Sequence, residues 1–185
     1  MDILIAGVGG QGTLLASRVL GKYALDMNLD CKLSEVHGMS QRGGSVITFV
    51  RIGEKINSPI IDTGSADVIL AFEKLEALRY AHYLKKDGFI LYSTQEIMPM
   101  PVLIGAAEYP SDIESKLPTN RHAIDALSLA EKAGNSKAAN SVILGAFTRI
   151  MGLDKEKMLS ALLACIPAKL TEINVKAFDL GYTAA

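Results

Sequence analysis

The sequence contains few cysteines and no tryptophan. Cys31 and Cys165 are the only cysteines among its 185 residues. Two thiols so far apart exclude a disulfide framework, a four-thiolate zinc site and an iron–sulfur cluster held by this chain alone. Since unpaired cysteine is among the most buried residue types, we expect two buried free thiols in a reducing cytoplasm.

The chain also lacks an excess of charge of either sign. It carries 19 Lys and Arg against 20 Asp and Glu, which gives a formal net charge of −1. Nucleic-acid-binding proteins usually need a basic excess, so nucleic acid is not an expected partner. The apolar run at residues 97–107 is shorter than the roughly 20 residues of a membrane span, and the N-terminus does not resemble a secretory signal. We therefore expect a soluble cytoplasmic protein.

Hydrophobic residues make up 49% of the chain, which suffices for a core. A length of 185 residues favours a single domain over residues 1–185. The periodicity predicts strands at residues 2–6, 31–36, 45–52, 67–71, 89–93 and 122–124, and helices at 11–27, 73–86, 125–134, 137–151, 155–166 and 169–180. Turn residues at 53–55, after the β-branched run 45–52, predict a hairpin there. The expected fold is a three-layer α/β/α Rossmann-like domain with a mostly parallel sheet containing a hairpin, and a helix-rich C-terminal third whose last helix docks or extends as an arm.

A glycine loop joins the first expected strand to the first expected helix. Residues 7–12, GVGGQG, fit the G-x-G-x-x-G pattern, in which the backbone and the helix N-terminus hold a phosphate. Dinucleotide sites add an acidic residue about 20 positions later, and Glu35 follows Gly12 by 23 residues. The alternative is a glycine turn needed only for close packing of the helix on the sheet. The Gln11 amide at the helix start is able to reach a ligand or a neighbouring loop; alternatively, Gln11 is an ordinary residue of the helix N-terminus.

A second polar loop, SEVHGMSQRGG at residues 34–44, follows the second expected strand. In an open α/β sheet it lies at the carboxyl edge beside the glycine loop, where such folds bind ligands. Ser40 is not in a G-x-S-x-G elbow, and the other histidines lack metal-ligand spacing, so neither a hydrolase triad nor a metal site is expected. The candidate catalytic residues are His37 and Arg42, and the candidate cofactor-binding residues are Gly7, Gly9, Gly10, Gln11, Gly12, Ser40, Gln41, Arg42, Gly43 and Gly44.

Five segments carry a resemblance to a known family. They are GVGGQGTLLASRVL, SEVHGMSQRGGSV, ADVILAFEKLEALRY, EYPSDIESKL and AIDALSLAEKAGNSKAANSVILGAF. In this order they resemble the gamma-type small subunit of the 2-oxoacid:ferredoxin oxidoreductases, and within it the beta subunits of indolepyruvate ferredoxin oxidoreductases. The likeness spans nearly the whole chain; Ser40 stands where alanine is more usual.

The resemblance implies part of an enzyme that oxidatively decarboxylates indolepyruvate and other aryl pyruvates. Coenzyme A is the co-substrate, and the products are an aryl-acetyl-CoA, carbon dioxide and reduced ferredoxin. Thiamine diphosphate and the iron–sulfur clusters are held by a separate large (alpha) subunit, through which ferredoxin is reduced. This chain then holds no cofactor alone, is inactive when isolated, and works in a hetero-oligomer, with a homodimer as the isolated form. The two loops are expected to meet the large subunit and hold part of coenzyme A.

Three alternatives stay open at this point. The first is the gamma subunit of a related pyruvate, 2-oxoglutarate or 2-oxoisovalerate oxidoreductase. Glu35 favours a free-standing NAD(P)-binding dehydrogenase or redox sensor, although no substrate domain is evident. The third alternative is a structural subunit whose glycine loops only pack against the large chain.

Overall fold

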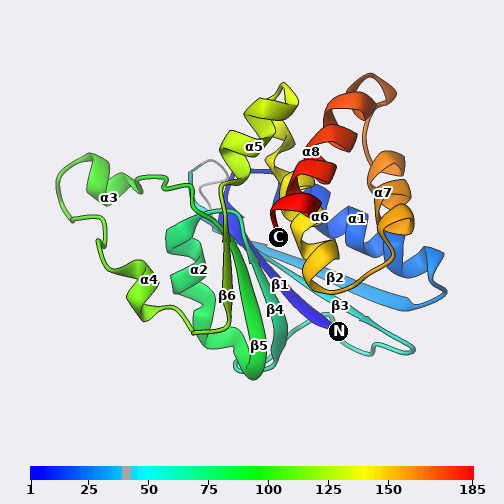
Figure 1. Ribbon diagram of the computed structural model, residues 1–185. Coiled ribbons are helices and arrows are strands. Elements are labelled where there is room, and N and C mark those ends of the chain that lie inside the picture. Colours follow the sequence, from blue (N-terminus) through cyan, green and yellow to red (C-terminus); the bar gives the residue numbers. More distant parts are fainter. Residues whose placement is uncertain (39–42) are drawn as a thin grey trace.

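The computed structural model describes residues 1–38 and 43–185, which form one six-stranded mixed sheet between two helical layers (Figure 1). The strands are β1 (Asp2–Val8), β2 (Asp30–His37), β3 (Ser45–Gly53), β4 (Ala66–Ala71), β5 (Leu84–Ser93) and β6 (Arg121–Ile124), in the order β2-β3-β1-β4-β5-β6. The pairs β1–β4, β4–β5 and β5–β6 are parallel, whereas β3 is antiparallel to both β1 and β2. The expected α/β class, with antiparallel pairing inside a largely parallel sheet, is confirmed.

The helices divide between the two faces of the sheet. They are α1 (Thr13–Asp26), α2 (Lys74–Tyr80), α3 (Met100–Leu103), α4 (Ile113–Lys116), α5 (Ala126–Ala133), α6 (Ala139–Ile150), α7 (Lys155–Ala164) and α8 (Thr171–Ala184), with 3-10 turns η1 (Ala81–Tyr83), η2 (Ser136–Ala138) and η3 (Ala168–Leu170). The buried residues of α1, α5, α6, α7 and α8 belong to one cluster, and those of α2 and α4 belong to the other. The helix after β1 and the helix after β4 therefore cover opposite faces.

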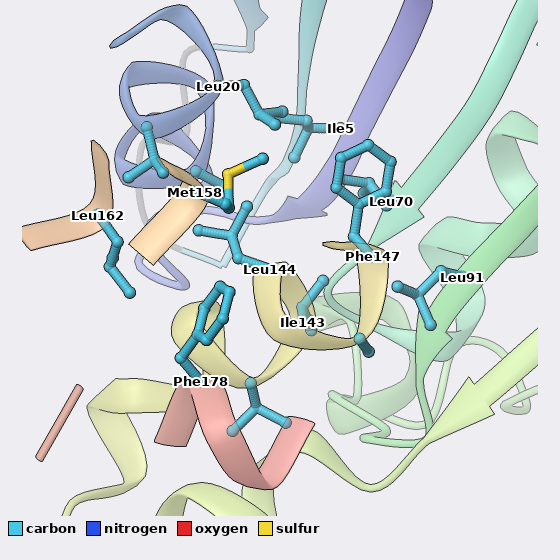
Figure 2. Packing of buried hydrophobic residues seen from close by; sticks show 14 of the residues in the cluster. Ile5, Leu20, Leu70, Leu91, Ile143, Leu144, Phe147, Met158, Leu162 and Phe178 are labelled. Carbon is cyan, nitrogen blue, oxygen red and sulfur yellow. The ribbon is translucent and has the colours of Figure 1, made fainter. Parts of the chain in front are cut away.

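Successive side chains of the central strand β1 point to opposite faces of the sheet and so belong alternately to the two hydrophobic clusters. Ile3 and Ile5 of β1 belong to the α1 and α6 side, whereas Leu4 and Ala6 belong to the α2 side. Figure 2 shows side chains of α6 packing with Leu20, Met158, Leu162 and Phe178 from the other helices and with Ile5, Leu70 and Leu91 from the sheet. Complete burial of such a side chain contributes roughly 1.5–3 kcal/mol. This packing fixes α6, and with it the residues at its N-terminus.

The last helix, α8, docks on α6 and does not extend as an arm. A Cβ atom on Gly145 would lie 2.0 Å from the carbonyl oxygen of Phe178, and one on Gly181 would lie 1.9 Å from that of Val142. Any larger residue at either position would push α6 and α8 apart, because neither backbone has space for a side chain.

Two expectations are wrong, one about the pairing of a strand and one about the end of a helix. The hairpin consists of β2 and β3, not of residues 45–52 and a strand after the turn at 53–55, because β3 inserts between β1 and β2 and pairs with both. Its nearly continuous burial is that of a central strand. The helix expected at 73–86 ends at Tyr80, because Leu84 pairs with Ala66 and already belongs to β5.

The two cysteines are half-buried, which corrects the expectation of fully buried thiols. Cys31 lies on β2, an edge strand, and Cys165 follows the end of α7, so each has one open side. Partial burial raises the pKa of both thiols. Within residues 1–38 and 43–185, every helix is too short or too polar to cross a membrane.

Candidate functional site

The two glycine-containing loops are hydrogen-bonded to each other at one edge of the sheet. The Gly9 amide donates to the Gly44 carbonyl at 2.8 Å, and the Gly43 amide donates to the Gly9 carbonyl at 3.2 Å. The expectation that the loops lie side by side is therefore confirmed. Pairing of Val8 with Ser45 brings them together, since the end of β1 meets the start of β3. Ser40, Gln41 and Arg42 lie outside the described residues, and their roles stay predictions.

Gln11 connects the ends of three strands. Its Oε1 accepts a hydrogen bond from the Val8 amide at 2.8 Å, and its Nε2 donates to the Phe72 carbonyl at 2.9 Å and to Gln95 Oε1 at 3.1 Å. Phe72 follows β4 and Gln95 follows β5. Of the two expected roles for this amide, the structure supports contact with neighbouring loops, because both of its polar atoms have partners inside the chain.

The glycines of the first loop serve different purposes. A Cβ atom on Gly7 would lie 2.8 Å from Thr13 Cγ2, so Gly7 is explained by close packing. Gly12 has φ +80°, and a Cβ there would lie 2.4 Å from Asn140 Nδ2. Gly10 has φ +107° but open space around it, so only its backbone conformation requires glycine. Packing therefore accounts for part of the motif, and the open position at Gly10 is compatible with a ligand.

A cavity of about 380 Å³ lies on one side of the loop, and we name it the Glu35 cavity. Glu35 and His37, both exposed on β2, line it together with residues from the first turn of α1. The His37 Nδ1 atom lies 3.0 Å from the Gly38 carbonyl. The expected position of Glu35 near the glycine loop is confirmed, although β3 separates its strand from β1. The full lining is Gly9, Gly10, Gly12, Thr13, Leu14, Glu35, His37 and Val46.

A second cavity of about 490 Å³ lies on the other side of the loop, and we name it the Lys137 cavity. The ends of β1, β4 and β5 form one wall, and α5, η2 and the start of α6 form the other. Asn140, only 5% exposed, donates from Nδ2 to the Gly12 carbonyl at 3.2 Å and so ties α6 to the loop. The lining is Gly10, Gln11, Gly12, Phe72, Ser93, Gln95, Leu127, Ser136, Lys137, Ala139, Asn140 and Ile143.

The sequence reasoning did not identify Gln95, Lys137 or Asn140 as site residues. They reach the glycine loop only through the strand order and the docking of α6. The one available signal was the segment at residues 123–147, which carried part of the family resemblance but no separate role for these side chains.

A buried polar network holds the start of β3, directly after Gly44. The Ser45 hydroxyl hydrogen-bonds to the Glu76 carboxylate and lies 2.9 Å from the Tyr80 hydroxyl. Glu76 is 3% exposed, and its charge is compensated by Arg79 at 3.0 Å. A buried carboxylate with such partners stabilises one arrangement of its surroundings, which here fixes the described end of the second loop.

Residues 1–38 and 43–185 contain no set of donors that fits an iron–sulfur cluster. The described residues contain no group of three or more His, Cys, Asp or Glu side chains placed to hold a metal ion. His82 lies in η1 beside Tyr80 and Tyr83, and His122 lies in β6 against Phe89.

Comparison with known proteins gives consistent matches over the whole chain. The family model described as "Pyruvate ferredoxin/flavodoxin oxidoreductase" matches residues 2–184. The protein named "Indolepyruvate oxidoreductase subunit IorB" of Pyrococcus horikoshii is 44% identical, and the alignment covers 100% of this chain and 95% of that protein.

Two solved structures share the fold. The gamma subunit of a keto/oxoacid ferredoxin oxidoreductase from Geobacter sulfurreducens PCA matches with TM-score 0.76 and 27% identity, covering 100% of this chain and 97% of that one. The 2-oxoglutarate:ferredoxin oxidoreductase of Magnetococcus marinus, solved with 2-oxoglutarate, coenzyme A and succinyl-CoA bound, matches with TM-score 0.75 and 18% identity. In that case the match covers 100% of this chain and 31% of the other.

Proposed function

Because the chain belongs to the pyruvate ferredoxin/flavodoxin oxidoreductase family, we propose that it is the small subunit of a cytoplasmic indolepyruvate:ferredoxin oxidoreductase. The complex converts indolepyruvate and other aryl pyruvates, with coenzyme A, into an aryl-acetyl-CoA, carbon dioxide and reduced ferredoxin. Identity of 44% to a full-length indolepyruvate oxidoreductase subunit supports this substrate. Thiamine diphosphate and the iron–sulfur clusters belong to a large alpha subunit, which also reduces ferredoxin.

The backbone hydrogen bonds between the two glycine loops are the observation that carries the proposal. Gly9 and Gly44 join the loops into one polar surface at the carboxyl edge of the sheet, where open α/β sheets bind ligands. The first turn of α1 contains no acidic residue and begins at Gly12, so its amides are suited to a phosphate. In the complex this edge faces the thiamine site, holds part of coenzyme A and keeps water from the reacting centre.

Reconstitution with the large subunit tests the activity and the substrate together. Ferredoxin reduction is measured with indolepyruvate, pyruvate, 2-oxoglutarate and 2-oxoisovalerate, each with and without coenzyme A. The expected result is a coenzyme-A-dependent rate with the highest kcat/KM for indolepyruvate. A higher kcat/KM for one of the other acids would assign the chain to the corresponding related enzyme instead.

Arg42→Ala tests the assignment of coenzyme A to this edge. Arg42 remains a prediction from the sequence, and its guanidinium suits a pyrophosphate. Loss of one charge-assisted contact is expected to raise the KM for coenzyme A about 10-fold to 100-fold, with a smaller effect on the KM for indolepyruvate. Arg18→Ala, an exposed change in the middle of α1, is the control and is expected to leave both constants unchanged. Unchanged kinetics in Arg42→Ala would remove this residue from the site.

One observation favours a second candidate function, the binding of NAD(P). Glu35 lines the same cavity as the first turn of α1, and in dinucleotide sites such a carboxylate accepts hydrogen bonds from the ribose. Thermal-shift titrations with NAD and with coenzyme A distinguish the two. A rise in Tm with NAD alone, lost in Glu35→Gln, would favour the dinucleotide function. Full activity of the complex after substitution of both loops would instead favour a purely structural subunit.

A further inference from the structure

The Lys137 cavity lies where the connections of the sheet change direction. The helix after β1 covers one face and the helix after β4 covers the other, so the ends of these adjacent strands are left open between them. Ligands of open α/β folds bind at such switch points. A volume of about 490 Å³ lies within the range of small-molecule sites, about 300–1,000 Å³.

The charge in the lining of this cavity is of one sign. Lys137 is the charged residue of the lining, and no carboxylate contributes to that lining. Elsewhere in the described part of the chain, no carboxylate forms an ion pair with Lys137. Asn135 Oδ1 accepts from the Lys137 amide at 3.0 Å and fixes the turn that carries the lysine. The cavity therefore has an uncompensated positive charge on a fixed backbone.

The lining also contains a neutral hydrogen-bond donor. Gln95 Oε1 is occupied by Gln11, whereas Gln95 Nε2 has no acceptor among the described residues. Asn140 is 5% exposed, and its Oδ1, which has no hydrogen-bond partner within the described part of the molecule, has almost no accessible surface. The contribution of this cavity to ligand binding therefore comes from Lys137 and the Gln95 amide, and Asn140 serves to hold α6 on the glycine loop.

We infer that the Lys137 cavity binds a phosphate-bearing small molecule, with the phosphate at Lys137 and Gln95. These donors come from η2, which directly precedes α6, and from the segment after β5. Donors on separate sides suit the several oxygens of a phosphate better than the plane of a carboxylate. Identification of the ligand as coenzyme A rests on the proposed function, whereas the phosphate site itself does not.

Calorimetric titration of the full chain with inorganic pyrophosphate tests this site. Wild type is expected to bind, and Lys137→Ala is expected to weaken binding about 10-fold or more, because a charge-assisted contact is lost. Lys137→Arg keeps the charge and is expected to stay within about threefold of wild type. Lys132→Ala, an exposed lysine of α5 outside the cavity lining, is the matched control and is expected to bind as wild type does.

Four results of these titrations would overturn the inference. It fails if wild type does not bind pyrophosphate, if Lys137→Ala binds it unchanged, or if Lys132→Ala loses as much affinity as Lys137→Ala. It also fails if phenylpyruvate binds in a Lys137-dependent manner and pyrophosphate does not, since the site is then one for carboxylates. Thermal unfolding of each variant checks the fold, and Lys137→Arg keeps the test decisive if Lys137→Ala is unstable. Failure of the proposed function is distinct, because it appears as missing activity of the reconstituted complex and leaves this titration unchanged.

Discussion

The two cavities on either side of the glycine loop share Gly10 and Gly12 but differ in charge and in origin. The Glu35 cavity is lined by residues between positions 9 and 46 and contains a carboxylate and an imidazole. The lining of the Lys137 cavity extends from position 10 to position 143 and contains an ammonium group and several amides. One loop thus borders two environments of opposite sign, of which one is assembled locally and the other by the tertiary fold.

The difference teaches which part of a ligand each side accepts. A carboxylate repels phosphate but accepts hydrogen bonds from hydroxyl groups, whereas a lysine attracts phosphate. Glu35 and His37 are exposed on the edge strand, while Asn140 is buried and joined to the loop through Gly12. Changes near Asn140 therefore affect stability and binding together, and changes at Glu35 affect binding alone.

The largest effect is expected for Gly12→Ala. The substitution places a Cβ at φ +80° and 2.4 Å from Asn140 Nδ2, so it strains the backbone and displaces the side chain that joins α6 to the loop. We expect the free energy of unfolding to fall by about 2–4 kcal/mol, measured by urea denaturation. Gly10→Ala is the matched control, because its φ is also positive but its surroundings are open. It is expected to cost only about 1 kcal/mol. Equal losses in the two variants would mean that the contact with Asn140 does not matter.

A smaller effect is expected at the wall of the Lys137 cavity. Asp125 Oδ1 accepts from the Ser128 amide at 3.0 Å and caps α5, the helix that places Leu127 in the lining. At pH 7, Asp125→Ala is expected to lower the free energy of unfolding by about 1 kcal/mol. Asp154→Ala removes the equivalent cap of α7, which lines neither cavity, and is expected to cost a similar amount without changing pyrophosphate affinity.

The pH dependence of Asp125→Ala provides a second test of this cap. The hydrogen bond from the Ser128 amide lowers the pKa of Asp125 in the folded state, so the unfolded chain binds a proton more readily than the folded chain does. The stabilisation is complete above the ordinary aspartate pKa of about 3.9 and is lost as the pH falls through the lower folded value. The difference between wild type and variant is therefore expected in urea titrations at pH 7 and 5 and absent in strong acid. A difference that persists in acid would show that the cap does not depend on the charge.

The sequence separation of the lining residues explains why one cavity was predictable from the sequence and the other was not. Glu35, His37 and the glycines lie within 40 positions of one another, and their strand–loop–helix context is readable from local periodicity. Gln95, Lys137 and Asn140 carry no such pattern. They approach Gly12 only because β5 lies two strands from β1 and because α6 packs across the sheet. Long-range assembly of this kind leaves no signal in a single sequence.

The wrong hairpin has the same physical cause. The β-branched side chains of residues 45–52 correctly predict a strand, and the turn residues at 53–55 lie where the chain leaves β3. The partner of a strand depends on which strand edges are available after folding, not on the nearest turn. Here β3 lies between β1 and β2 and pairs with one edge of each strand. Element types were therefore predictable, while the pairing of this one strand was not.

The smallest effect is expected for Glu35→Gln, and this variant tests whether the cavities act separately. Glu35 is exposed, so its repulsion of an anion across the loop is weakened by solvent and by salt, whose screening length is about 10 Å at 0.1 M. Pyrophosphate affinity is therefore expected to rise by less than about threefold at 0.1 M salt, and by more at lower salt. A tenfold gain that persists at high salt would place the anion in direct contact with Glu35 and merge the two sites into one. A small, salt-sensitive gain, together with the large loss in Lys137→Ala, would instead mean that pyrophosphate binds in the Lys137 cavity and that Glu35 does not contact it.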